Sequence, residues 1–209
     1  MKILEIFKTP VAKFVLNEDL KALAKFSRQW AKNHPSVSGK LQHLTMDGKM
    51  VDEKMLTIKG GGYQSILDSK IPELQSLREQ TTRCFNELGA KFFCGVPLTI
   101  ATMWLNINYP HSSYEVHNHP RCCFASSFYV SVPKNSGNIV FYNNYEMENY
   151  MDNKWMTQFG TYNSSAWTLP VENNVFYVFP AWLKHRVENN NSKKNRISIS
   201  INATDGGLR

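Results

Sequence analysis

The sequence predicts an α+β protein folded as one domain over residues 1–209, with a mainly helical part over 1–95 and a jelly roll of short antiparallel strands over 96–209. Two observations predict this order. Apolar residues recur at helical spacing only in the first half of the chain. Beyond about residue 96 they gather in short runs rich in Val, Ile, Phe, Tyr and Trp, which turn residues separate.

Two helices are expected in the first part, packed on one sheet. The first would follow Asn17 as N-cap, carry Leu20, Leu23 and Trp30 on one side, and end before His34-Pro35. The second would run from about Pro72 to about Leu88, with Gly89 as its stop. Residues 3–16 contain two short β-like runs, and residues 36–62 are predicted as loop with a turn at Asp47-Gly48.

Six runs are predicted as strands, namely residues 97–109, 124–133, 137–142, 166–169, 174–179 and 195–202. The last run is the clearest, because its residues alternate in character. Ile197, Ile199 and Ile201 would share one face of this strand. The opposite face would carry four polar side chains, those of Arg196, Ser198, Ser200 and Asn202.

Composition excludes several classes of protein. No apolar run is long enough to span a membrane, and the start MKILEIFK is too short for a secretory signal, so we expect the protein to stay in the cytoplasm where it is made. The four cysteines have no disulfide-framework spacing and are interpreted as reduced thiols. The formal net charge of +7 favours anionic partners only mildly, because the basic residues are scattered.

The histidine pattern is the main chemical signal. In His117-Asn118-His119 the two imidazoles would project to the same side of an extended segment, so both can reach one ion. His185 follows a late apolar run, which a jelly roll can bring beside them. Arg196 comes eleven positions later with Ser198 on the same strand face, a pair of donors that suits a carboxylate.

These segments resemble a known family. The ordered set WLNINYPHSSYEVHNHP (104–120), FASSFYVSVP (124–133), GNIVFYN (137–143), VFYVFPAWLKHRVENN (175–190) and RISISIN (196–202) is similar to the 2-oxoglutarate/Fe(II)-dependent oxygenases of bacteria and phages. EIFKTPV (5–11) and GGYQS (61–65) also match that family's pattern. The resemblance is weakest over 31–60 and 145–170.

The resemblance implies a double-stranded β-helix whose Fe(II) is bound by His117, His119 and His185. It implies that 2-oxoglutarate chelates the iron and meets Arg196 and Ser198 with its far carboxylate, with Tyr129 and Asn106 as further contacts. The reaction would convert 2-oxoglutarate and dioxygen to succinate and carbon dioxide while oxidising a substrate. Ascorbate is expected to stimulate it.

Two departures from the family and its wider superfamily are evident. The superfamily mostly uses H-x-D or H-x-E, whereas His119 stands at the middle position here; Glu115, in reversed order, is the alternative ligand. Ser127 occupies a strand position where the family usually has Gly.

Other classes of protein remain open from the sequence. The same three histidines suit a cupin-like metal-binding protein or isomerase without oxygenase activity. A structural or carbohydrate-binding β-sandwich would bind no metal. A nucleic-acid substrate is disfavoured, because no aromatic-plus-basic base-flipping motif is present. The sequence identifies neither the prime substrate, nor the oligomeric state, nor a bacterial or phage source.

Overall fold

The structure is a computed structural model that describes residues 8–33, 40–44, 50–54, 65–92, 95–144 and 157–206. Its elements, in chain order, are β1 (Ala12–Val15), α1 (Leu20–Asn33), β2 (Lys40–Leu44), β3 (Met50–Lys54), α2 (Pro72–Phe92), β4 (Thr99–Asn108), β5 (Tyr114–His117), β6 (Phe124–Ser131), β7 (Ile139–Tyr142), β8 (Ala166–Leu169), β9 (Val175–Pro180), β10 (His185–Val187) and β11 (Arg196–Thr204). No helix among these residues combines the length and apolar character needed to cross a membrane.

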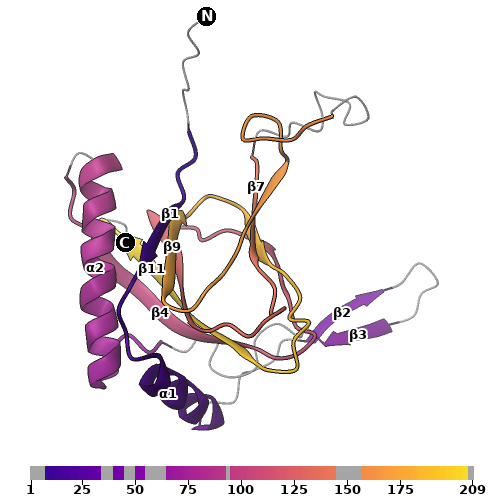
Figure 1. Ribbon diagram of the computed structural model, residues 1–209, viewed down its shortest axis with the longest axis horizontal. Helices are drawn as coiled ribbons and strands as arrows, with labels where there is room; N and C mark the ends of the chain where they lie inside the picture. The colour runs from indigo at the N-terminus through magenta and orange to yellow at the C-terminus, as the bar shows by residue number, and fades with distance from the viewer. Residues whose placement is uncertain are drawn as a thin grey trace, which may run out of the picture.

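Two antiparallel sheets form the jelly roll. The larger has the strand order β1-β9-β6-β11-β4, and the smaller has the order β5-β10-β7-β8. In Figure 1 both helices lie outside the larger sheet, and β7 of the smaller sheet lies on the opposite side. α1 contacts β6 and α2 contacts β4. The predicted α+β jelly roll with N-terminal helices packed on one sheet is therefore confirmed.

Strand β11 divides its side chains between two environments. Ile197, Ile199 and Ile201 are at most 1% exposed and join the core that the larger sheet forms with α1 and α2. Burying such a side chain stabilises the fold by about 1.5 to 3 kcal/mol. The alternate residues of β11 face the space between the sheets. This alternation is the one that the sequence predicts for residues 196–202.

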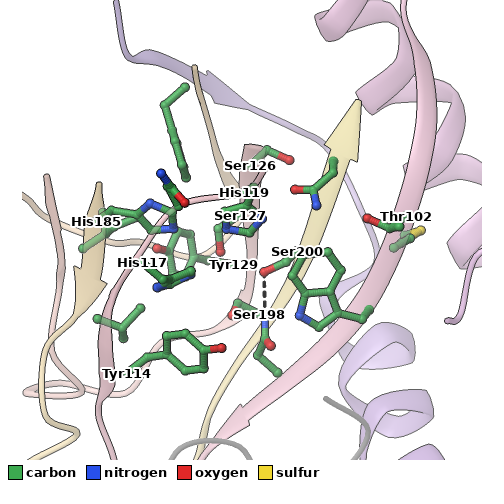
Figure 2. Close-up of a pocket in the computed structure, with 18 of the residues that line it drawn as sticks. Thr102, Tyr114, His117, His119, Ser126, Ser127, Tyr129, His185, Ser198 and Ser200 are labelled. Atoms are coloured by element: carbon green, nitrogen blue, oxygen red, sulfur yellow. Dashed lines mark hydrogen bonds between the residues drawn. The ribbon is translucent and has the colours of Figure 1, made fainter. Parts of the chain in front are cut away.

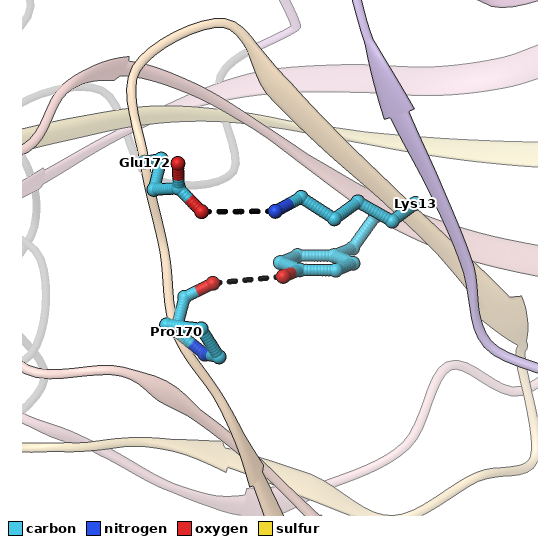
Figure 3. Close-up of polar contacts among 4 residues, drawn as sticks. Lys13, Pro170 and Glu172 are labelled. Carbon is cyan, nitrogen blue, oxygen red and sulfur yellow. Dashed lines mark hydrogen bonds and ion pairs between the residues drawn. The ribbon is translucent and has the colours of Figure 1, made fainter.

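Strand β1 closes the edge of the larger sheet and is tied to the segment that precedes β9 (Figure 3). The Nζ atom of Lys13 lies 2.9 Å from Oε1 of Glu172, and the hydroxyl of Tyr177 donates to the carbonyl of Pro170 at 2.7 Å. The ion pair is exposed and so adds little stability. The backbone register from Ala12 to Val15 against Val178 to Val175 holds this edge.

Two of the predicted helix ends are wrong. The N-cap of α1 is Asp19 rather than Asn17, because Oδ1 of Asp19 accepts hydrogen bonds from the amides of Lys21 and Ala22 at 2.9 and 3.0 Å. α2 continues past Gly89 to Phe92. Gly89 serves close packing instead of chain termination, because a Cβ there would lie 2.9 Å from the carbonyl oxygen of Val96.

Residues 36–62 are not all loop as predicted, since β2 and β3 form an antiparallel hairpin with Lys40 opposite Lys54. Their sequences, KLQHL and MVDEK, lack the apolar alternation that signals a strand. The predicted turn at Asp47-Gly48 lies outside the described residues, as do the first of the two N-terminal runs up to residue 7, Cys94 and most of GGYQS.

Candidate metal and co-substrate site

The three predicted histidines converge between the sheets (Figure 2). His117 ends β5 and His185 begins β10, and these two residues are paired directly across the smaller sheet. His119 lies two residues beyond β5, where its backbone amide donates to the carbonyl of Ala181 at 2.8 Å. Ligand nitrogens of the three imidazoles all lie within 4.8 Å of one another. This spacing suits three ligands of one ion.

Backbone carbonyls orient two of the rings. Nδ1 of His117 lies 2.8 Å from the carbonyl oxygen of Glu115, and Nδ1 of His185 lies 2.9 Å from that of Leu183. Each carbonyl can only accept, so each Nδ1 carries the proton and each Nε2 keeps a free lone pair. Metal-bound histidines in proteins are held in this way.

All three imidazoles are held neutral. Burial lowers the pKa of His185 to about 3 and that of His119 to about 4, and it lowers the pKa of His117 as well. The proximity of His117 lowers the first two pKa values further. An imidazole must be neutral to bind a metal, so the apolar surroundings keep the three side chains in their ligating form at neutral pH.

Aromatic rings surround the cluster and fix the imidazole planes. Tyr114 meets His117 edge-to-face with ring centroids 4.4 Å apart, and Phe179 meets His185 in the same manner at 4.6 Å. Trp104 of β4 stacks on His119 with centroids 5.8 Å apart. These contacts restrict ring rotation and exclude water from the space around the three nitrogens.

Arg196 is a buried cation in the same cavity. It is 1% exposed, and its Nη1 donates to the backbone carbonyls of Ser136 and Gly137 at 3.0 and 2.9 Å. Its Nε has no hydrogen-bond partner in the part of the chain that the structure describes. No carboxylate lies within ion-pair distance of it among the described residues, although Glu188 attracts it from farther away. The buried charge therefore has no direct ion-pair partner there.

The other predicted contacts of 2-oxoglutarate form a row beside Arg196. Ser198 of β11 is paired with Asn106 of β4 on one side and with Tyr129 of β6 on the other. All three are at least nine-tenths buried. Nδ2 of Asn106 donates to the hydroxyl of Ser200 at 2.7 Å, and Oδ1 of Asn106 has no hydrogen-bond partner among the described residues. Hydroxyls, an amide and a guanidinium in a row can hold a carboxylate.

One cavity of about 460 Å³ joins the three histidines to this row. Among the described residues no Asp or Glu lines it, and Arg196 is the only lining residue there with a permanent charge. Ser127 also lines it, so a hydroxyl stands where the family usually has Gly. Glu115, the alternative ligand, has an exposed side chain and is absent from the metal-ligating group among the described residues, whereas His119 belongs to it.

Sequence reasoning missed several residues of this cavity, among them Trp104, Tyr114, Asn108, Ser200 and Asn202. A signal for two of them was available, because Ser200 and Asn202 stand on the polar face already predicted for residues 196–202. Tyr114 and Trp104 carry no such signal, since an aromatic residue in a strand usually packs in the core.

Comparison with known families decides the class of protein. Residues 102–202, the segment from β4 to β11 that holds every residue of the cluster and the row, match the family described as "Putative 2OG-Fe(II) oxygenase". Over this segment the chain is similar to the 2OG-Fe(II) oxygenase family. This oxygenase is thus an oxidoreductase that uses Fe(II) and takes 2-oxoglutarate and dioxygen as co-substrates. No curated protein matches the chain.

Solved structures similar to this oxygenase share its fold. A prolyl-4-hydroxylase of Pseudomonas putida is 12% identical with a TM-score of 0.61, over 93% of this chain and 91% of that one. A viral collagen prolyl hydroxylase of Paramecium Bursaria Chlorella virus-1, in complex with 2OG, is 9% identical with a TM-score of 0.56, over 92% and 94%. SnoK, a non-heme alpha ketoglutarate dependent carbocyclase from nogalamycin biosynthesis, is 14% identical with a TM-score of 0.59, over 93% and 79%.

Proposed function

We propose that this oxygenase binds Fe(II) through the Nε2 atoms of His117 and His185 and through one ring nitrogen of His119. The proposal is supported by the donor atoms within 4.8 Å of one another and by the two Nδ1 atoms committed to backbone carbonyls. The donor set fits iron, because imidazole nitrogen is a common ligand of Fe(II). Three neutral ligands leave the full charge of the ion available to anionic partners.

The guanidinium of Arg196 would take the far carboxylate of 2-oxoglutarate. The observation that carries this assignment is a buried guanidinium that has no direct ion-pair partner among the described residues, in the same cavity as the three histidines. Nη1 is already engaged with two carbonyls, so Nε and Nη2 are the donors left for the ligand. Ser198 and Tyr129 would add hydroxyl contacts and Asn106 an amide contact, since all three also line the cavity.

Fe(II) held by His117, His119 and His185 would supply the activation of dioxygen, with 2-oxoglutarate converted to succinate and carbon dioxide as the substrate is oxidised. The protein keeps the imidazoles neutral, holds the co-substrate by its far end, and excludes water with Trp104, Tyr114 and Phe179. The substrate that is to be oxidised would enter the cavity beside His119, where Trp104, Asn118 and Pro120 also line the cavity.

We also propose that residues 1–209 work as one oxygenase domain in the cytoplasm. Support comes from the shared core of both helices with the larger sheet and from the free thiols of Cys84, Cys122 and Cys123.

The test follows conversion of 2-oxoglutarate to succinate by the purified protein with Fe(II) and ascorbate, without any prime substrate. His185→Ala should abolish this turnover, and Arg196→Ala should raise the KM for 2-oxoglutarate. His111→Ala is the matched control, because His111 is a histidine outside the cavity lining. Unchanged kinetics in both His185→Ala and Arg196→Ala would reject the assignment.

A further inference from the structure

His119 differs from the other two histidines in the group that its ring contacts. Nδ1 of His117 and Nδ1 of His185 each face a backbone carbonyl two residues earlier in the chain. Among the described residues no backbone carbonyl faces the ring of His119 in this way; instead, the side chain of Asn202 lies close enough to the ring to raise the pKa of His119. A carboxamide on a different strand thus stands where the other two rings have the main chain.

The surroundings of Asn202 leave its carbonyl oxygen available for this contact. Asn202 is 7% exposed and lines the cavity. Its Oδ1 is buried, and no donor among the described residues meets it with full hydrogen-bond geometry. Leaving a buried amide oxygen without a hydrogen-bond partner is unfavourable, so an N–H donor directed at it is strongly favoured.

The plane of the His119 ring is fixed independently of the amide. Trp104 stacks on it with an interplanar angle of 25°, and His185 lies nearly parallel to it at 15° with ring centroids 5.2 Å apart. Stacking leaves open which of the two nitrogens points at the centre of the cluster. A neutral imidazole has one N–H and one lone pair, so an acceptor on one side decides which nitrogen is free for a metal.

We propose that Asn202 is a positioning residue of the iron site: its Oδ1 accepts the N–H of His119 and thereby turns the other ring nitrogen toward the metal. This inference rests on the proposed function. It gives β11 two tasks in the same cavity, since the strand holds the co-substrate near its start through Arg196 and orients a ligand through Asn202 six residues later.

The test measures metal affinity directly, by competition of Co(II) between a chelator and the purified full-length protein. Asn202→Leu keeps the approximate shape but removes the acceptor, and should weaken Co(II) binding about 10- to 100-fold, the usual range for groups that orient a metal-bound histidine. Asn202→Asp keeps an acceptor and should stay within a few-fold of the wild type. The visible spectrum of bound Co(II) should change in Asn202→Leu and not in Asn202→Asp.

Asn106→Leu is the matched control. It removes the other cavity amide whose Oδ1 is buried without a partner, on the row proposed for 2-oxoglutarate. It should leave Co(II) affinity unchanged and weaken binding of 2-oxoglutarate to the metal-loaded protein. Asn202→Leu should do the reverse. Should Asn202→Leu fail to fold by circular dichroism, Asn202→Ala takes its place with the same expectation.

Co(II) affinity of Asn202→Leu within twofold of the wild type would overturn the inference. So would weakened 2-oxoglutarate binding at saturating Co(II) with unchanged metal affinity, because Asn202 would then contact the co-substrate. Equal losses in Asn202→Leu and Asn202→Asp would also overturn it, since an acceptor would not matter. If the wild type binds no Co(II), or His185→Ala binds it equally well, the proposed function itself fails; His185→Ala thus separates the two failures.

Discussion

The buried histidines predict that the metal-free protein loses stability in mild acid. The ordinary pKa of His is 6.5, and the pKa values of His185 and His119 in the folded protein are about 3 and about 4. The unfolded chain therefore binds more protons than the folded protein between pH 6.5 and pH 4. By linkage, the contribution of these histidines is complete above pH 6.5 and falls as the pH drops toward their folded values.

The expected loss in the free energy of unfolding follows from the difference between the pH and the pKa of histidine in the unfolded chain. A pH of about 5 is about 1.5 units below the pKa of a histidine in the unfolded chain. Protonation of the unfolded chain therefore lowers the free energy of unfolding by about 2 kcal/mol for each imidazole that stays neutral in the folded protein. His185 is 4% exposed and should show this effect in full. His119 is only partly buried, so solvent screens part of its shift and the two together should contribute about 3 to 4 kcal/mol.

The assay is urea denaturation of chelator-treated protein at about pH 7 and about pH 5, for the wild type and for His185→Leu. Replacing the titrating side chain should reduce the pH-dependent loss in the free energy of unfolding by about 2 kcal/mol. The difference between the two proteins cancels the other groups that titrate in this range. An equal loss in wild type and variant would refute the reasoning that His185 is neutral because it is buried.

Three further substitutions test the packing of the loop beside Arg196, of the core and of α2. Gly137→Ala should weaken the binding of 2-oxoglutarate to the Mn(II)-loaded protein about tenfold, as measured by calorimetry. The added Cβ would lie 2.6 Å from the carbonyl oxygen of Glu188 and push the loop of residue 137 away from Arg196. Unchanged affinity would contradict this. Ile199→Ala, at a position with 0% exposure, should lower the free energy of unfolding by about 2 to 5 kcal/mol in urea, and a loss under about 1 kcal/mol would count against the core described here. Gly89→Ala should lower the Tm despite the better helix propensity of Ala, because the added Cβ would press on the carbonyl oxygen of Val96. Gly160→Ala should not lower the Tm, because a Cβ there meets nothing within 4 Å. Equal changes in Tm for the two variants would show that the contact with Val96 is unimportant.

Much of the fold was predictable because its strands follow the simplest pattern. Alternation in residues 196–202 gives both faces of β11 correctly, and the run predicted at 166–169 coincides with β8. The strands β5 and β10 were not predicted, because they have only four and three residues, too few for a period to emerge. The hairpin of β2 and β3 was missed because polar residues dominate both strands.

The site was predictable where spacing alone brings groups together, as in His117 and His119. That His185 joins them depends on a pairing of strands 68 positions apart, which the resemblance implied and local pattern did not. The partners of each ring were hidden from the sequence for another reason. Backbone carbonyls such as those of Glu115 and Leu183 have no residue signature, and an amide such as Asn202 looks like any polar strand residue.

Because one face of β11 is covered by α1 and α2 while the other bears the guanidinium, changes in the helical layer have a route to the chemistry. A substitution that shifts a helix would move the backbone of β11 on which it packs, and Arg196 and Asn202 on the opposite face would move with that backbone. Variation in the first ninety residues is thus free to tune affinity for the co-substrate without altering any group that touches it.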